Sequence, residues 1–279
     1  DGNINIPVME KLIDFLIEGG LHGIFVFGTT GEFYAVSNEQ YRDTLEAVVS
    51  HVNGRVPVFA GANHITTRGV IDMVGIAEKT GVDAVSVLTP MFISPSANEL
   101  INHFKAIAQS TGLPILLYNN VQKTGVNIPA GMVEKLADIP NIVGIKDSSG
   151  DFTLTMEYIR RGGSREFYVF AGRDTLIYPC LCCGGHGAVA ACANIVPRLC
   201  ADIYNNFKAG NHKGALELQY KLAPLRMAFN LGTFPAVVKC ALELLGIKAG
   251  SCCAPVADLS DENKEALKMI LRDMGELKD

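Results

Sequence analysis

The sequence predicts an α/β fold, a (β/α)₈ TIM barrel followed by a C-terminal helical extension. Seven short apolar runs alternate with helical patterns at intervals of roughly 20 to 35 residues, the period of a parallel sheet. The runs are apolar throughout, as strands covered on both faces are. The length of 279 residues suits one such barrel. Because a closed barrel needs eight strands, we expect the first strand to precede residue 1, unless the barrel is built differently.

The elements follow from hydrophobic periodicity, taken in chain order. A helix is expected over residues 7–20, where apolar residues recur at helical spacing and two glycines end the pattern. Buried strands are expected at 23–28, 56–60, 84–88, 115–118, 142–146, 167–171 and 187–191. Helices are expected between them at 39–51, 68–80, 97–111, 130–138 and 154–161.

The C-terminal part of the chain is helical. Four more helical patterns cover residues 196–209, 212–230, 234–245 and 261–274. They exceed what one barrel helix requires. We therefore divide the chain into a barrel over residues 1–195 and, over residues 196–279, the last barrel helix with a small extension packed on the barrel.

Composition and charge exclude several classes of partner. The net charge is −5 without a basic block, which argues against nucleic acid, and no apolar run approaches the ~18 residues of a membrane span. All eight cysteines follow residue 179, with apolar neighbours and no CxxC pair, so we expect thiols in a reducing cytoplasm rather than disulfides or structural zinc. The six histidines are scattered, and no metal site is expected.

One buried strand ends in a lysine. Residues 142–146 read Ile-Val-Gly-Ile-Lys, and a small polar turn follows. Desolvation of an ammonium is costly, lowers its pKa and makes the amine a nucleophile. We therefore hypothesise that Lys146 forms a Schiff base with a carbonyl substrate. The alternative is a lysine that extends to water or pairs with Asp147.

Other strand ends offer partners for this lysine, because a parallel barrel places its chemistry at the carboxyl ends of its strands. Residues 28–32 read Gly-Thr-Thr-Gly-Glu, whose hydroxyls and N–H groups suit a carboxylate, or else an ordinary helix cap. Tyr118 ends the strand before that of Lys146, ~5 Å away, and is a candidate proton shuttle or a rim aromatic with its hydroxyl in water.

A phosphate site has weaker support. The glycine-rich residues 184–187 precede the last strand, which places them at the opposite mouth of the barrel. Only Gly172-Arg173, after the strand at 167–171, suggests an anion site.

Together these motifs resemble the dihydrodipicolinate synthase / N-acetylneuraminate lyase superfamily. The resemblance rests on Gly28-Thr29-Thr30-Gly31-Glu32, Tyr118-Asn119 and Gly144-Ile145-Lys146-Asp147, with Lys146 placed 28 residues after Tyr118. Gly187-Ala188-Val189 and the helix with Pro235 and Lys239 look like the C-terminal half of that family.

The resemblance implies a class I aldolase-type lyase with neither metal nor other cofactor. Lys146 would form the imine with pyruvate or another 2-oxo acid, Tyr118 would carry protons, and Thr29 would be the third catalytic residue. The substrate-binding residues would be Thr29 and Thr30 at the carboxylate, together with Gly28, Val189 and Lys123. The resemblance also implies an aldehyde as the second substrate and a homotetramer built as a dimer of dimers.

Departures from the family pattern bear on that second substrate. Met91-Phe92 stands where the synthase branch has an aromatic pair whose second tyrosine enters a neighbouring subunit. Lys123 stands where that branch has an arginine, and a lysine cannot offer the same bidentate fork. Val121 replaces a proline, and Asp147-Ser148 differs from the neuraminate lyase branch.

These departures favour a 2-keto-3-deoxy sugar acid, or a similar pyruvate-yielding compound, as the substrate. The alternatives are a 4-hydroxy-tetrahydrodipicolinate synthase, an N-acetylneuraminate lyase, or a non-catalytic sensor that binds a 2-oxo acid, since fold alone does not decide function.

Overall fold

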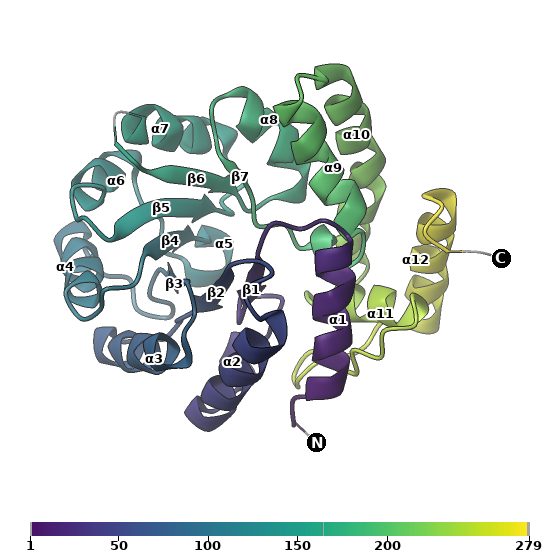
Figure 1. The fold of residues 1–279 in the computed structure, drawn as a ribbon, viewed down its shortest axis with the longest axis horizontal. Helices are drawn as coiled ribbons and strands as arrows, with labels where there is room; N and C mark the ends of the chain where they lie inside the picture. Colours follow the sequence, from purple (N-terminus) through teal and green to yellow (C-terminus); the bar gives the residue numbers. More distant parts are fainter. Residues whose placement is uncertain (1, 164, 278–279) are drawn as a thin grey trace.

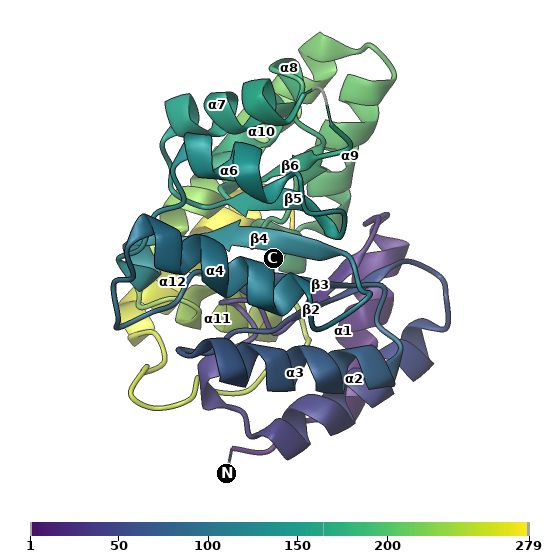
Figure 2. The same ribbon diagram turned by 90° about the vertical axis from the view of Figure 1, so that its left-hand side faces the viewer.

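A computed structural model describes residues 2–163 and 165–277 and contains a seven-stranded parallel sheet (Figure 1). The strands pair in chain order, each with the next, from β1 to β7. Their bounds are β1 Ile24–Val26, β2 Val58–Gly61, β3 Ala84–Leu88, β4 Ile115–Asn119, β5 Ile142–Asp147, β6 Tyr168–Ala171 and β7 Gly187–Ala188. The sheet curls into part of a barrel with helices on its outer side (Figure 2).

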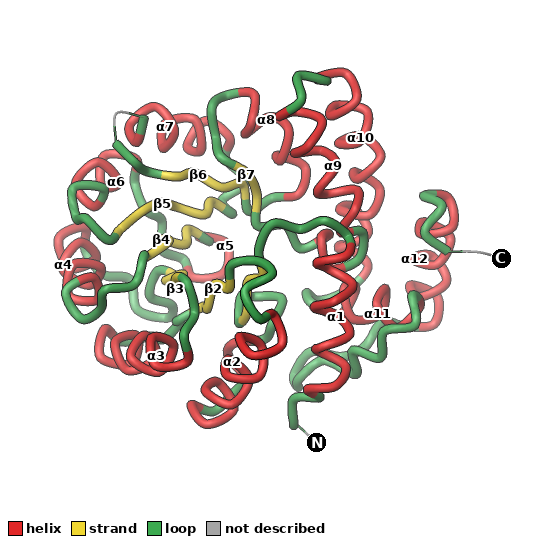
Figure 3. Tube along the Cα trace, in the orientation of Figure 1, coloured by secondary structure: helices red, strands yellow, loops and turns green. Residues whose placement is uncertain are grey.

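The helices alternate with the strands along the chain (Figure 3). The outer helices are α1 Ile6–Glu18, α2 Asn38–Val52, α3 Thr67–Thr80, α4 Ala97–Ala108, α6 Ala130–Leu136 and α7 Phe152–Gly162. Polar residues begin several of them: Ser37 with Gln40, and Ser96 with Glu99, form capping boxes that satisfy the first free N–H groups of α2 and α4. These signals explain why the helices begin close to where the periodicity predicts.

The predicted strands are confirmed, and the first and the last are shorter than predicted: β1 spans three residues instead of six. β7 spans two residues instead of five, because the chain turns into a 3₁₀ segment at Cys192–Asn194. Two helices were not predicted, α5 Val121–Thr124 and α8 Ile177–Cys182. Both lie within loops after strands and have at most six residues, too few to show a helical period.

β1 and β7 are the edges of the described sheet, and no ladder joins them. A cavity of about 1650 Å³ extends along both edges, between the carboxyl ends of the strands and α1. The described residues do not test whether a strand precedes residue 1, so that strand stays a prediction.

The C-terminal helices are α9 Pro197–Lys208, α10 His212–Ala228, α11 Ala236–Leu244 and α12 Asp261–Asp273. One apolar cluster joins the first six strands to the outer helices, and a second runs from Ile177 to Met274. These clusters do not test the predicted division of the chain at residue 195 into barrel and C-terminal helices, which stays a prediction. Within the described residues no single helix is long and apolar enough to cross a membrane; only the pair 212–231 and 236–244, bent by 118°, meets that length and composition.

Candidate active site

The strands β4 and β5 hold Tyr118 and Lys146 directly opposite each other in the parallel ladder. The Lys146 ammonium lies 4.1 Å from the centroid of the Tyr118 ring and 4.8 Å from that of Phe25 on β1. Lys146 is only 6% exposed, and it has no carboxylate partner among the described residues. The amine is therefore buried at the end of its strand and surrounded by aromatic faces instead of a counter-ion.

Asp147 points to the other side of the sheet, because side chains alternate along a strand. Its carboxylate accepts hydrogen bonds from Thr155 on α7 at 2.6 Å, from the amide of Asn119 at 3.1 Å, and from Ser149. The Lys146–Asp147 ion pair considered as an alternative is thus wrong, and the small exposed fraction of Lys146 also argues against its extension to water.

The Tyr118 hydroxyl is the centre of a polar cluster. It shares a hydrogen bond of 3.1 Å with the Thr29 hydroxyl and accepts one of 3.0 Å from the side-chain amide of Asn120. Burial alone raises the pKa of Tyr118, but the Lys146 charge and hydrogen bonds from Thr29, Ser148 and Asn120 oppose it, and the net result is a lowered pKa. Since Tyr118 is 3% exposed, its hydroxyl is not the water-facing rim group of the alternative interpretation.

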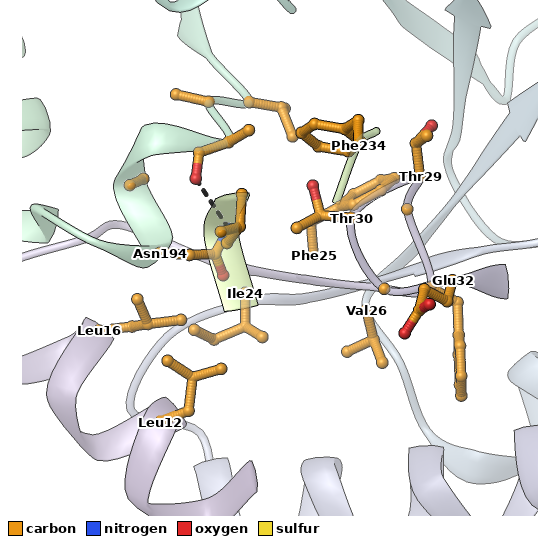
Figure 4. Close-up of a pocket in the computed structure, with 18 of the residues that line it drawn as sticks. Leu12, Leu16, Ile24, Phe25, Val26, Thr29, Thr30, Glu32, Asn194 and Phe234 are labelled. Atoms are coloured by element: carbon orange, nitrogen blue, oxygen red, sulfur yellow. Dashed lines mark hydrogen bonds between the residues drawn. The ribbon is translucent and has the colours of Figure 1, made fainter. Parts of the chain in front are cut away.

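The loop after β1 carries Thr29 and Thr30 into the cavity (Figure 4). The Thr29 hydroxyl is hydrogen-bonded to Tyr118, and the 3₁₀ turn that follows, Phe33–Ala35, has Glu32 in the N-cap position without a side-chain cap bond. The helix-cap alternative is therefore wrong. The backbone N–H groups of Thr29 and Thr30 donate no hydrogen bond within the described part of the chain, so they are available to an anion.

An ion pair from the C-terminal part of the chain anchors this loop. Glu32 adopts a left-handed conformation with φ of 50°, and its carboxylate lies 2.6 Å from the Lys239 ammonium of α11. The same carboxylate accepts a hydrogen bond of 2.8 Å from the backbone N–H of Cys253. Residues more than 200 positions apart in the sequence therefore hold the turn that contains the two threonines.

The structure brings the other predicted site residues to the same cavity. Gly28, Thr30, Lys123 and Val189 line it together with Lys146, and among the described residues no hydrogen bond joins Lys123 or Val189 to the amine. Lys123 lies exposed in the last turn of α5, and Val189 continues the β7 ladder with a hydrogen bond to Ala171. At Gly28 a Cβ would approach the Phe25 ring to 2.5 Å, so a side chain there would displace a neighbour of the lysine.

Arg173, which the sequence suggests as part of an anion site, lines the same cavity. Sequence reasoning missed three neighbours of the amine and the phenol: Phe25, Asn120 and Ser148. The alternation of side chains along a strand could have indicated two of them. Asn120 and Ser148 each follow a predicted site residue by two positions, which places them on the same face. Across the described ranges 2–163 and 165–277, no three His, Cys, Asp or Glu side chains are grouped as metal ligands would be.

Comparison with known proteins places this arrangement in a family. Residues 1–274 match the model of the dihydrodipicolinate synthetase family. The 4-hydroxy-tetrahydrodipicolinate synthase of Thermodesulfovibrio yellowstonii is 39% identical over 277 residues, which are 99% of this chain and 95% of that protein. The enzyme of the same name from Methanocaldococcus jannaschii is 38% identical, over 98% of this chain and 93% of its own.

Solved structures agree with the sequence relatives. The chloride-inhibited dihydrodipicolinate synthase of Acinetobacter baumannii, in a complex with pyruvate, superposes with a TM-score of 0.96 at 31% identity, covering 99% of this chain and 95% of that one. The curled parallel sheet thus corresponds to the barrel of these neighbours. The chain therefore belongs to the dihydrodipicolinate synthetase family, and it is a class I, metal-independent lyase of the aldolase type.

Proposed function

We propose that Lys146 forms an imine with pyruvate and that this chain joins the bound pyruvate to an aldehyde. The observation that carries the proposal is the buried ammonium of Lys146 beside the Tyr118 phenol, which is itself bonded to Thr29. The pyruvate complex of the Acinetobacter baumannii relative supports pyruvate as the first substrate.

The proposed steps use groups that already lie at the strand ends. The amine of Lys146 adds to the keto carbon of pyruvate, the resulting hydroxyl takes a proton from Tyr118 and leaves as water, and a protonated imine remains. The imine withdraws electrons, so a proton leaves the methyl carbon and an enamine forms. The enamine carbon attacks the aldehyde carbon, whose oxygen takes up a proton, and water then releases the amine. We assign the proton transfers to Tyr118 and Thr29.

The pyruvate carboxylate would lie in the loop after β1. The N–H groups of Thr29 and Thr30 and the Thr30 hydroxyl are free to bind it, and Gly28 leaves space beside Phe25. Val189, on the same cavity, would contact the bound substrate. This position sets the keto carbon of pyruvate near the amine instead of beside the exposed Lys123.

For the second substrate we propose aspartate semialdehyde, the reaction of a 4-hydroxy-tetrahydrodipicolinate synthase. Relatives with that printed name, at 39% and 38% identity, favour this alternative over the expected 2-keto-3-deoxy sugar acid. The substitutions at Phe92 and Lys123, which motivated the sugar-acid expectation, lie outside the Lys146–Tyr118–Thr29 cluster.

Borohydride trapping with pyruvate, read by mass spectrometry, tests the imine. We expect a reduced adduct on the peptide that contains Lys146, its loss in Lys146→Ala, and its retention in the matched control Lys213→Ala, whose side chain is 88% exposed. An adduct that survives Lys146→Ala would overturn the proposal. A coupled assay with pyruvate and aspartate semialdehyde, beside pyruvate release from 2-keto-3-deoxy acids, then decides the second substrate.

We further infer that the chain assembles as a homotetramer and works in the cytoplasm. Phe92 lies on the loop after β3, is 89% exposed and has a positive φ of 71°. Together with the exposed Ile93 it makes an apolar patch that is suited to contact another subunit. Sedimentation of the wild type and of Phe92→Glu tests the assembly: the variant should shift toward smaller species. The eight free thiols support a reducing compartment.

A further inference from the structure

The cavity contains more positive charge than its carboxylates balance. Lys239 is paired with Glu32 at 2.6 Å, and Arg226 with Asp174 at 3.3 Å. Three other cations on the cavity wall, Lys123, Arg173 and Lys248, have no carboxylate partner among the described residues. A cavity that contains these unpaired cations as well as the imine-forming amine is suited to a second anionic group.

Arg173 is held over the end of β5 by close packing. It follows Gly172, where a Cβ would lie 2.0 Å from the Ser148 hydroxyl oxygen, so that the loop after β6 can lie directly against the loop after β5. The guanidinium Nε donates a hydrogen bond of 3.3 Å to the Ser148 carbonyl. A guanidinium nitrogen would also be 3.2 Å from a Cβ at Gly150, a position with φ of +81°. Gly150 thus leaves room for the guanidinium, and Gly172 allows its loop to pack against Ser148.

The guanidinium keeps most of its donors free. A guanidinium has five N–H donors, and of those of Arg173 only the one on Nε makes a hydrogen bond to the part of the chain that the structure describes. Burial lowers the pKa of Arg173, and the nearby charge of Arg226 adds to that effect. The group is therefore partly desolvated and incompletely hydrogen-bonded, a state that binding of an anion would relieve.

The anion that fits is a carboxylate instead of a phosphate. A phosphate site usually gathers several free backbone N–H groups. Here the N–H of Gly172 already donates to the Asp147 carbonyl at 2.7 Å, and that of Ser148 to the Asn119 carbonyl at 2.8 Å. The planar guanidinium of Arg173, without free N–H groups of Gly172 and Ser148 beside it, matches the two oxygens of a carboxylate.

We propose that Arg173 binds the carboxylate of the aldehyde substrate through its guanidinium fork, with Lys123 as a second cation at the same group. Lys123 alone supplies a single point charge, whereas Arg173 supplies the bidentate geometry. The inference rests on the proposed function and specifies its second substrate as an aldehyde that carries a carboxylate. It makes Arg173 a specificity residue of the condensation.

A competition between two aldehydes that differ only in the carboxylate tests this role. Succinate semialdehyde and butanal are mixed at equal concentration with saturating pyruvate, and the product ratio gives the ratio of their kcat/KM values. We expect the wild type to prefer succinate semialdehyde. In Arg173→Gln this preference should fall by about 10- to 100-fold, in line with one lost charge-assisted interaction, and Arg173→Lys should restore part of it.

The control variant is Arg68→Gln on α3, whose side chain is 85% exposed and does not line the cavity, and it should keep the wild-type ratio. An unchanged ratio in Arg173→Gln, or a wild type without preference, overturns the assignment. A second readout needs no variant: raising the salt concentration should raise the wild-type KM for succinate semialdehyde, and a flat profile also counts against the assignment.

Borohydride trapping in the same proteins separates this inference from the proposed function. If the wild type forms no pyruvate adduct, the proposed function fails. If the wild type and Arg173→Gln both form the adduct while the aldehyde ratio is unchanged, only the role of Arg173 fails.

Discussion

Lys146 and Tyr118 face each other across β4 and β5, with the lysine nitrogen 4.1 Å from the centre of the phenol ring. The ammonium and the phenol are both buried, and the charge of Lys146 lowers the pKa of Tyr118. A change to Lys146 should therefore be measurable at Tyr118.

Removal of the lysine charge should raise the pKa of Tyr118. In the wild type the Lys146 ammonium and three hydrogen bonds outweigh burial and lower this pKa below the ordinary value of 10.0. In Lys146→Met burial remains and the charge is lost, so the pKa should rise above that of the wild type. Tyrosinate absorbance followed against pH measures it, and Tyr118→Phe identifies the signal by its disappearance. A Tyr118 titration that is unmoved in Lys146→Met would contradict the coupling.

A methyl group at Gly144 should disturb the site through the backbone. Its Cβ would lie 2.3 Å from the Tyr168 carbonyl on β6, which belongs to the main chain and cannot rotate away. We expect Gly144→Ala to lower the free energy of unfolding by about 1–3 kcal/mol and to reduce turnover, because Lys146 follows two residues later. The control is Gly75→Ala on α3, where a Cβ has open space and should be neutral or stabilising. Urea unfolding and the coupled assay measure both effects.

The Glu32–Lys239 pair should contribute to pyruvate binding as well as to stability. Lys239→Met leaves a buried carboxylate without its partner, which we expect to lower the free energy of unfolding by about 3 kcal/mol and to raise the KM for pyruvate. The double variant Glu32→Gln/Lys239→Met should recover part of that loss. Lys213→Met, which removes an exposed pair, should cost less than about 1 kcal/mol. Additive effects of the two single variants would argue against the pairing.

The buried His103 should make stability fall in mild acid. Burial lowers the pKa of His103 from 6.5 to about 4, and its Nδ1 shares a hydrogen bond of 2.9 Å with the Thr67 hydroxyl. The unfolded chain therefore binds a proton below pH 6.5 that the folded chain does not bind until about pH 4. Stability from the neutral imidazole is complete above that window and is lost as pH falls through it.

Between pH 7 and pH 5 this linkage amounts to up to about 2 kcal/mol of unfolding free energy. In His103→Gln the decline over that interval should be smaller by a similar amount. Parallel pH profiles of the two proteins, measured by urea unfolding at each pH, would show that His103 is not the responsible group.

Local patterns predicted much of the fold and the centre of the site. Lys146, Tyr118 and Thr29 were found because each stands where an apolar strand ends, and parallel strands bring such ends together. The sequence could not show that Glu32 pairs with Lys239. Hydrophobic periodicity indicates which residues of one helix or strand share a face, but not which distant elements come into contact. The sequence also could not show that the Arg173 guanidinium keeps free donors, because that depends on Asp174 pairing with Arg226 instead of Arg173, which only the packing reveals.

The irregularity at the start of β5 determines how the site tolerates changes in chain length. Ile115 pairs with Ile142, but Leu116 pairs with Gly144, so one extra residue, Val143, is absorbed before the ladder continues. Deletion of Val143 would leave the count from Gly144 to Lys146 intact. Deletion of Ile145 would reverse the parity of the strand, turning the amine toward the helices and the Asp147 carboxylate toward the cavity. The chemistry at this strand thus depends on the even spacing between Gly144 and Lys146 as much as on which amino acids are present.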